Sequence, residues 1–557
     1  MALQKSKIAL LVSSALIANG ALAHEVPAPA KPDQVETDVS VPLYDDLGDL
    51  TYPITTDSEL AQRYFDQGLR LTYAFNHAEA LRAFRAAQQQ DPDCALCYWG
   101  EAFVLGPNIN APMDEAADDP AVTAIDKAKE LAHQASPREQ VLIEALAKRY
   151  SDDPNAERAA LDQAYAQAMA EAVKRFPDDH EIALLYVDSL MNLSPWDYWE
   201  ADGKTPKGKS GEAVRTAERV LAKDPNHPGA IHLYIHLVEA SANPERAEPY
   251  ADRLAALMPG AGHIVHMPSH IYYRIGRFQD SIETNKAAVA ADEAYLAEVD
   301  AEGIYPYGYY PHNIHFVIAS AQLIGDRETA IEYVERLKGK IPAEIAEQIG
   351  PAQHIMTAPY FAHAQLSNPE TILALPDPGD KLPFLRGMWH YARGVAFATQ
   401  GDVENARSEA ARIAELNQTS DFSLLLAWMV PAPDVLNLAR HVLEGRIAQA
   451  EGDPERAIRE FEIAVAIQDS LPYMEPPYWY YPVRQSLGAA LLQADKPEEA
   501  EQIFNQTLEN SPNNGWALYG LMEAQKAQGN GAAAKETEQR LNQAWLGNPN
   551  NLELRRL

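Results

Sequence analysis

The sequence is poor in cysteine and in basic residues. Among its 557 residues there are two cysteines, and 80 Asp and Glu residues face 46 Lys and Arg residues, for a formal net charge of −34. Two cysteines exclude a disulfide-dense fold. A strongly acidic surface repels phosphate backbones and anionic lipids, so we expect neither a nucleic acid nor a membrane surface as partner.

Familiar catalytic motifs are absent as well. The sequence contains no H-E-x-x-H, no G-x-S-x-G and no Gly-rich phosphate loop, so no motif supports an enzyme of those classes. The cysteines, Cys94 and Cys97, form a C-x-x-C pair, and Tyr98 stands where attachment of a c-type haem requires His. In an exported protein such a pair forms a disulfide, with redox activity or metal binding as alternatives.

Long apolar runs are confined to the N-terminus. Lys5 and Lys7 precede an apolar run from Ile8 to Ala18, and Ala21-Leu22-Ala23 follows as a small-residue cleavage site. This pattern predicts a signal peptide over residues 1–23, and the run is too short for a permanent membrane span. We therefore expect an exported, periplasmic or secreted protein that begins at His24, with a flexible Pro-rich leader over residues 24–49.

Helical repeats occupy most of the remaining chain. Gly68, Ala80, Phe84, Ala87 and Pro92 follow one another at intervals of 12, 4, 3 and 5 residues. In such a unit a small residue lies where two helices cross, Ala and an aromatic residue lie on the second helix, and Pro ends the unit. The pattern recurs in Ala213, Ala217, Val220 and Pro225; in Ala247, Ala251, Leu254 and Pro259; in Gly445, Ala457, Phe461 and Ala464; and in Gly488, Ala500, Phe504 and Pro512.

At these positions the chain resembles the tetratricopeptide repeat (TPR) family, from about Leu60 to Trp545. The resemblance implies an all-α fold, an α-solenoid of helix pairs wound into a right-handed superhelix. The segments Asp91–Gly100, His266–Phe278 and Glu475–Leu492 also resemble an exported bacterial TPR subfamily, which implies a fold rather than an activity. We expect N-terminal repeats over 50–190, central repeats over 191–366, a loop over 367–385, C-terminal repeats over 386–545 and a tail over 546–557.

Histidines gather in the central repeats, between Pro228 and Phe316. Seven of the 16 histidines of the chain lie there: His232, His236, His263, His266, His270, His312 and His315. When three repeats are aligned, these histidines share the second, fifth and ninth places. Such places form one face of a helix, and in the TPR family that face lines the concave groove. Pro268 is expected to kink or delay its helix and so to weaken the spacing of the His266 and His270 pair.

This histidine face predicts a metal site. Neutral imidazole is the commonest side-chain ligand of zinc, copper and similar ions, and two histidines four residues apart can chelate one ion. Glu239 follows the first such pair. The predicted ligands of a copper or zinc ion are His232, His236, Glu239, His263, His266, His270, His312 and His315, and Tyr273, Tyr309 and Tyr310 are expected to line the same groove.

Two other functions fit the same pattern. Histidines and tyrosines in a groove also bind a small ligand, a peptide or a protein by hydrogen bonds, which would make the chain a metal-free scaffold. A metal with an open coordination position would instead activate water, with Glu239 or a tyrosine as proton carrier. A free amine at His24 is a further candidate copper ligand. The sequence does not predict the oligomeric state.

Overall fold

The computed structural model describes residues 41–153, 155–301 and 303–557. The predicted signal peptide, His24 and the leader as far as residue 40 lie outside them. The described chain is all-α, as predicted: it contains no β-strand, only isolated bridges between Asn108 and Ala111 and between Trp199 and Pro206. No helix in this part of the chain is long and apolar enough to cross a bilayer.

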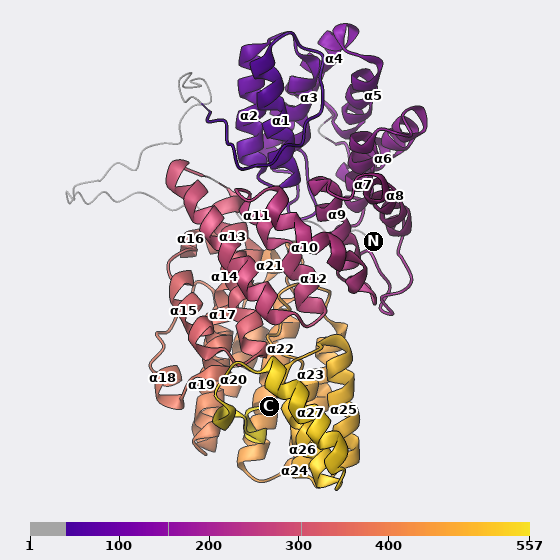
Figure 1. Ribbon diagram of the computed structural model, residues 1–557. Helices are drawn as coiled ribbons and strands as arrows, with labels where there is room; N and C mark the ends of the chain where they lie inside the picture. The colour runs from indigo at the N-terminus through magenta and orange to yellow at the C-terminus, as the bar shows by residue number, and fades with distance from the viewer. Residues whose placement is uncertain (1–40, 154, 302) are drawn as a thin grey trace, which may run out of the picture. The chain divides into compact units, whose positions relative to one another are not determined.

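The helices follow one another closely along the chain (Figure 1). The first group comprises α1 (Glu59–Tyr73), α2 (His77–Gln90), α3 (Ala95–Leu105), α4 (Asp118–Leu131), α5 (Pro137–Leu146), α6 (Arg158–Arg175), α7 (His180–Met191) and α8 (Ser210–Lys223). The central group comprises α9 (Pro228–Val238), α10 (Glu248–Leu257), α11 (Gly262–His266), α12 (Pro268–Arg274), α13 (Phe278–Glu298), α14 (Tyr310–Leu323), α15 (Arg327–Leu337), α16 (Ala343–Ala346), α17 (Gly350–Leu366) and α18 (Pro369–Leu373).

The last group runs from residue 383 to the end of the chain. It comprises α19 (Pro383–Thr399), α20 (Val403–Thr419), α21 (Ser423–Ala427), α22 (Ala432–Ala450), α23 (Pro454–Ser470), α24 (Arg484–Gln493), α25 (Pro497–Asn510), α26 (Gly515–Ala527) and α27 (Gly531–Ala544). Short 3-10 or π turns are η1 (Glu115–Ala117), η2 (Ala132–Gln134), η3 (Ala147–Arg149), η4 (Pro244–Ala247), η5 (Tyr305–Tyr309), η6 (Pro549–Asn551) and η7 (Leu554–Arg556).

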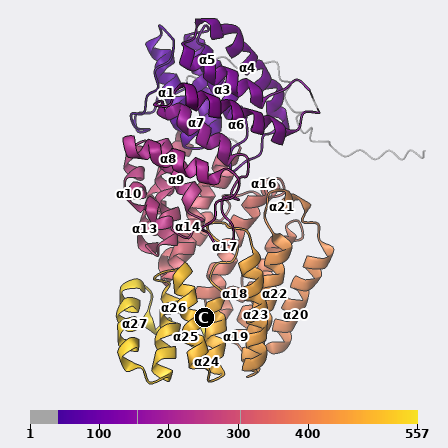
Figure 2. The same ribbon diagram turned by 90° about the vertical axis from the view of Figure 1, so that its right-hand side faces the viewer.

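Neighbouring helices pack in pairs (Figure 2). A Cβ atom added to Gly68 on α1 would lie 2.6 Å from the ring of Phe84 on α2. The same separation holds between Gly445 and Phe461, and between Gly488 and Phe504. The sequence spacing therefore has a packing cause, because the glycine gives the aromatic ring of the next helix the space it occupies.

Three of the predicted divisions contain residues with tertiary contacts or helical turns. At the end of the predicted leader Leu47 is buried, and the carbonyl of Asp46 accepts a hydrogen bond from the Gly260 amide at 2.9 Å. The predicted loop 367–385 contains α18 and the first residues of α19. The predicted tail 546–557 includes two 3-10 turns and ends in Leu557, which is buried. Local sequence missed these contacts because their partners lie far away in the chain.

Four helices of the central group carry the predicted histidines. Helix α12 packs against both α9 and α11, and α11 packs against α14. The segment between α23 and α24 also reaches this region, because the hydroxyl of Tyr473 donates to a carboxylate oxygen of Glu239 at 3.2 Å. The histidines of three repeats and a segment more than 200 residues away thus meet in one place.

Candidate metal centre

The predicted histidines lie on helix faces that look toward one another. His232 and His236 lie on α9, His263 and His266 on α11, and His270 on α12. All five are at least 98% buried. His312 and His315 lie on α14; His315 is buried and His312 is partly exposed. The helix faces are therefore arranged as the repeat register predicted.

Three of these residues, His232, His236 and His263, form a group that we call the first triad. Each can offer a ring nitrogen that lies within 4.8 Å of the others. The Nε2 atoms of His232 and His263 are 3.2 Å apart. The rings of His232 and His236 are 4.9 Å apart between centroids. This is the spacing of side chains that share a small ligand.

The Nδ1 atoms of two rings in the first triad are already occupied. His232 donates from Nδ1 to the Tyr73 carbonyl at 2.5 Å, and His236 donates from Nδ1 to Glu239 Oε1 at 2.7 Å. Because Nδ1 holds the proton, Nε2 of both rings carries a lone pair. The buried Nε2 of His236 and Nδ1 of His263 have no hydrogen-bond partner among the described residues.

A second group, His266, His270 and His312, forms the second triad. Its ligand atoms also lie within 4.8 Å of one another, and the Nε2 atoms of His266 and His270 are 2.9 Å apart. The helix is broken at Pro268, as predicted, into α11 and α12. The expected loss of the i, i+4 contact does not follow, because the backbone at Met267 stays in the right-handed helical region and keeps both rings on one side.

The Nδ1 atoms of this second pair are likewise committed. His266 Nδ1 lies 2.7 Å from Asn285 Oδ1, and the amide nitrogen of Asn285 donates to the Ser281 carbonyl at 2.7 Å, which fixes the amide orientation. His270 Nδ1 donates to Glu239 Oε2 at 2.6 Å. Both rings therefore hold their proton on Nδ1 and direct their Nε2 lone pairs at each other.

Glu239 joins the two triads. Its side chain is fully buried, and its two oxygens accept from His236 of the first triad and His270 of the second. Burial alone would raise the pKa of this carboxyl, but the His270 and His236 rings outweigh it and hold the pKa well below its usual range. Glu239 is therefore a carboxylate that orients the His236 and His270 imidazoles from behind, an arrangement common in zinc sites.

A second buried carboxyl, Glu475, lies beside it. Glu475 Oε2 is 3.6 Å from His270 Nδ1 and has no hydrogen-bond partner in the described chain. Burial and the neighbouring Glu239 raise the pKa of Glu475 well above its usual value. Arg274 Nε lies 3.9 Å from the other carboxyl oxygen. That oxygen, Oε1, accepts a hydrogen bond from the Tyr473 hydroxyl at 2.5 Å, so only Oε2 of Glu475 lacks a partner.

Burial keeps the imidazoles neutral. It lowers the pKa of His232, His263, His266 and His312 well below the usual histidine value, and neighbouring histidines add to this effect. A neutral imidazole is the form that binds metal ions. These four rings are therefore held in the neutral, ligating form.

Two sequence expectations about the histidines need correction. The side chains are buried among one another instead of lining an open groove, because Phe75, Glu475 and the packed helices cover them. His315 is separate from both triads; its ring lies 5.2 Å from that of His354 on α17. On α14, the His312 ring lies in the second triad, whereas the His315 ring lies beside that of His354.

Of the three predicted tyrosines, one contacts a histidine of a triad and two do not. The Tyr309 ring lies 4.6 Å from that of His263, and its hydroxyl accepts from the Asn110 amide at 3.1 Å. Tyr273 packs on Phe316, whose ring also contacts His270. Tyr310 instead donates to Glu293 at 2.8 Å. Tyr309 borders the first triad, whereas Tyr273 and Tyr310 belong to the helix packing around it.

Sequence reasoning missed the residues that cover the cluster. The Phe75 ring is nearly parallel to those of His236 and His263, at 6.0 and 5.4 Å. Phe75 lies in a turn with φ of 53°, an uncommon conformation for a residue with a side chain. Tyr473, Glu475 and Asn285 were missed too. The only local signal was the Glu475–Leu492 segment, which sequence analysis linked to a subfamily without assigning it a contact.

The two cysteines are joined by a disulfide at the start of α3, where both are fully buried. Of the alternatives that the C-x-x-C spacing left open, the structure has the disulfide form. The pair therefore contributes no thiolate ligand.

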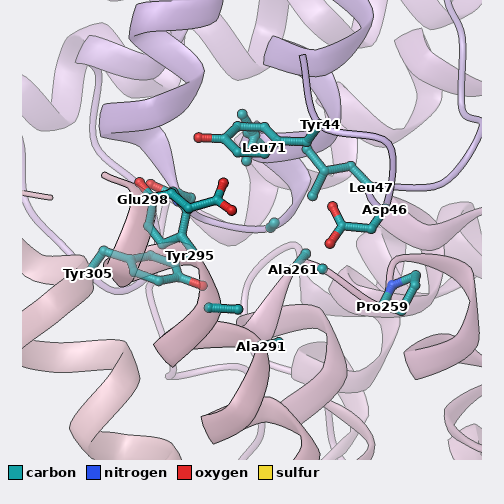
Figure 3. A pocket seen from close by; sticks show the side chains of 14 residues that line it. Tyr44, Asp46, Leu47, Leu71, Pro259, Ala261, Ala291, Tyr295, Glu298 and Tyr305 are labelled. Atoms are coloured by element: carbon teal, nitrogen blue, oxygen red, sulfur yellow. The ribbon is translucent and has the colours of Figure 1, made fainter. Parts of the chain in front are cut away.

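A separate cavity lies between the N-terminal and central helices (Figure 3). It has a volume of about 130 Å³, and Tyr44, Asp46, Tyr295 and Glu298 are among its lining residues. The Tyr44 and Tyr295 hydroxyls both donate to Glu79, at 3.1 and 3.3 Å. None of the predicted site residues lines the cavity.

Comparison with known proteins supports the repeat assignment. A family model of the tetratricopeptide repeat matches residues 491–557. Among solved structures, the human IFIT1 dimer with m7Gppp-AAAA shares 13% identity over 88% of this chain and 91% of that chain, with a TM-score of 0.32. Yeast Tom70 shares 11% identity over 86% and 92%, with a TM-score of 0.29.

Naa15/Naa10 bound to HypK-THB shares 14% identity over 87% of this chain and 70% of that chain, with a TM-score of 0.22. TM-scores this low carry no inference about a ligand, and no curated protein matches the chain. The prediction against nucleic acid, which came from charge, stays a prediction. The family model therefore places a tetratricopeptide repeat at residues 491–557, and the same glycine–aromatic helix packing recurs at Gly68 and Phe84 and at Gly445 and Phe461.

Proposed function

We propose that this repeat protein binds a transition-metal ion, copper or zinc, through its buried histidines. The observation that carries the proposal is the pair His266 and His270. Their Nε2 atoms are 2.9 Å apart, while both Nδ1 atoms face oxygen acceptors. Two lone pairs at this distance repel each other, and a cation between them would remove the repulsion.

A proton and a metal ion are the two cations that fit. A second proton on His266 would make its ring an imidazolium, which burial and the neighbouring His270 disfavour because they lower the pKa of His266. A metal ion at this position removes the repulsion and also gives a partner to His312, and an ion at the first triad gives one to the unpartnered Nε2 of His236. The metal therefore accounts for more of the unpaired atoms than the proton does.

The ligand chemistry indicates the class of ion. The triads offer imidazole nitrogens alone, and the only two cysteines are in a disulfide. Imidazole sets with carboxylates behind them suit zinc and copper, whereas magnesium and calcium prefer oxygen ligands. Zinc and copper are accordingly the ions to test first.

The test is metal uptake by the full chain after chelation and dialysis. We expect stoichiometric Zn²⁺ or Cu²⁺ in the wild type by elemental analysis, and a reduced content in His266→Asn. His133→Asn is the matched control, because His133 is exposed and outside the triads. A wild type that takes up neither ion would contradict the proposal and leave a metal-free scaffold as the function of the repeats.

The predicted export has its own test. We propose that the chain is cleaved after Ala23, on the strength of the N-terminal sequence pattern. Mass spectrometry of the protein recovered from the periplasm or medium would give a mature chain starting at His24. An intact N-terminus in a cytoplasmic fraction would contradict it.

A further inference from the structure

Resting on the proposed function, we infer that the protein holds two metal ions, one in each triad, and that Glu239 couples the two sites. A single polyhistidine centre is the simpler arrangement. The geometry of the ring nitrogens separates the two cases.

The close nitrogen pairs lie within the triads and not between them. Metal–nitrogen bonds of about 2.0–2.1 Å at angles of 90–109° place two ligand nitrogens about 2.8–3.4 Å apart. The pair His232 and His263 at 3.2 Å and the pair His266 and His270 at 2.9 Å each fit this range. Each pair belongs to a different triad, so each defines its own ion position.

The third ring of each triad completes the separation. Ligand atoms within 4.8 Å of one another form two sets of histidines. His236 belongs with the pair His232 and His263, and His312 belongs with the pair His266 and His270. Neither set contains a histidine of the other triad. One ion with four ligands leaves at least two of the six rings unused, whereas two ions use all six.

Each triad also has its own support behind the rings. In the first, the Tyr73 carbonyl and Glu239 Oε1 hold the Nδ1 protons; in the second, Asn285 Oδ1 and Glu239 Oε2 do so. The two oxygens of Glu239 thus orient His236 and His270 at once. An ion at one triad fixes the carboxylate that orients a ring of the other, which makes Glu239 the physical link between the sites.

A third set of possible ligand atoms does not add a third ion. It consists of Glu239, His270 and Glu475. Glu239 and His270 Nδ1 already bind each other at 2.6 Å, and an ion inserted there would break the contact that orients the second triad. The expected number is therefore two ions per chain.

The experiment is equilibrium dialysis of the chelator-stripped full chain against Zn²⁺, with elemental analysis of the bound metal. The wild type and the control His133→Asn are expected to hold two ions per chain. His263→Asn and His312→Asn are each expected to hold one, and the double variant none. Circular dichroism of each variant, compared with the wild type, shows that the helices are intact.

The outcomes distinguish the two claims. One ion in the wild type, or the loss of all metal in a folded single variant, would overturn the two-site inference while leaving the proposed function in place. Three ions would overturn it as well. No ion in the wild type would overturn the proposed function itself.

Discussion

At the scale of single residues, the proposed metal centre depends on which nitrogen of each imidazole holds the proton. Tyr73, Glu239 and Asn285 determine this by accepting from Nδ1. The Nε2 atoms are consequently available to an ion. The sequence predicted the imidazoles, and the structure adds the acceptors that prepare them.

Replacing Glu239 by Gln tests this preparation. Glutamine offers one oxygen and one NH₂ group, so it can accept from His236 or His270 but not from both. We expect at least one Zn²⁺ ion to bind about 10–100-fold more weakly, the usual cost of losing a partner behind a metal ligand. Competition with a chromogenic chelator measures the change, and affinities equal to wild type would show that Glu239 does not orient the rings.

A buried acid outside the triads predicts a pH effect on stability. Burial raises the pKa of Asp292 to about 7, although Tyr305 and Asn313 donate to it. A carboxyl with a raised folded-state pKa stabilises the fold fully below its unfolded pKa, and this stabilisation is lost as pH rises toward 7. Asp292→Asn removes the titrating group.

The comparison is urea unfolding of wild type and Asp292→Asn at pH 5 and pH 8. Between pH 5 and the folded-state pKa of about 7, the protonated Asp292 loses about 3 kcal/mol of its contribution to stability. The free energy of unfolding of the wild type should therefore fall by about that much, relative to the variant, between pH 5 and pH 8. An unchanged difference between the two proteins would contradict the assigned titration.

At the scale of helices, the repeat signature and its packing agree. Gly488 on α24 lies against the Phe504 ring of α25, where an added Cβ would come within 2.6 Å. Gly531, at the start of α27, has nothing within 4 Å. The first glycine is required by a neighbouring helix and the second is not.

Alanine at these two positions should therefore behave differently. We expect Gly488→Ala to lower the free energy of unfolding by about 1–3 kcal/mol through overpacking. Gly531→Ala should leave it unchanged or raise it by less than about 1 kcal/mol. Denaturant midpoints measure both, and equal effects would mean that the glycine spacing has no packing role.

Helix-level prediction succeeded where the cause is local and failed where it is not. Gly68 and Phe84 lie 16 residues apart on adjacent helices, and the register of the histidines follows from the same periodicity. The break at Pro268 was also local and was predicted. Its effect was not, because the contact between His266 and His270 depends on the backbone of Met267 and on packing by α14.

At the scale of the whole molecule, the cluster is assembled from distant parts of the sequence. Phe75 and Tyr73 come from the first repeat, and Tyr473 and Glu475 from a segment near the other end. No local pattern in the sequence specifies such contacts, since they arise only once the helices have packed. This is why the histidines could be predicted and the residues that cover them could not.

Metal should therefore stabilise the folded chain broadly. An ion that binds only the folded state adds about 2.7 kcal/mol at 100 times its Kd. We expect chelation to lower the Tm of the wild type and Zn²⁺ to restore it, with no such response in the His263→Asn, His312→Asn double variant. Differential scanning calorimetry measures this, and an identical Tm with and without Zn²⁺ in the wild type would mean that the ion does not contribute to the fold.

The most direct measurement is anomalous diffraction at the zinc or copper edge from crystals of the metal-loaded protein. The account predicts two anomalous peaks, one about 2.0–2.1 Å from Nε2 atoms of His232, His236 and His263, the other at the same distance from ring nitrogens of His266, His270 and His312. Loaded crystals with no peak at either triad would contradict the claim that these histidines bind metal.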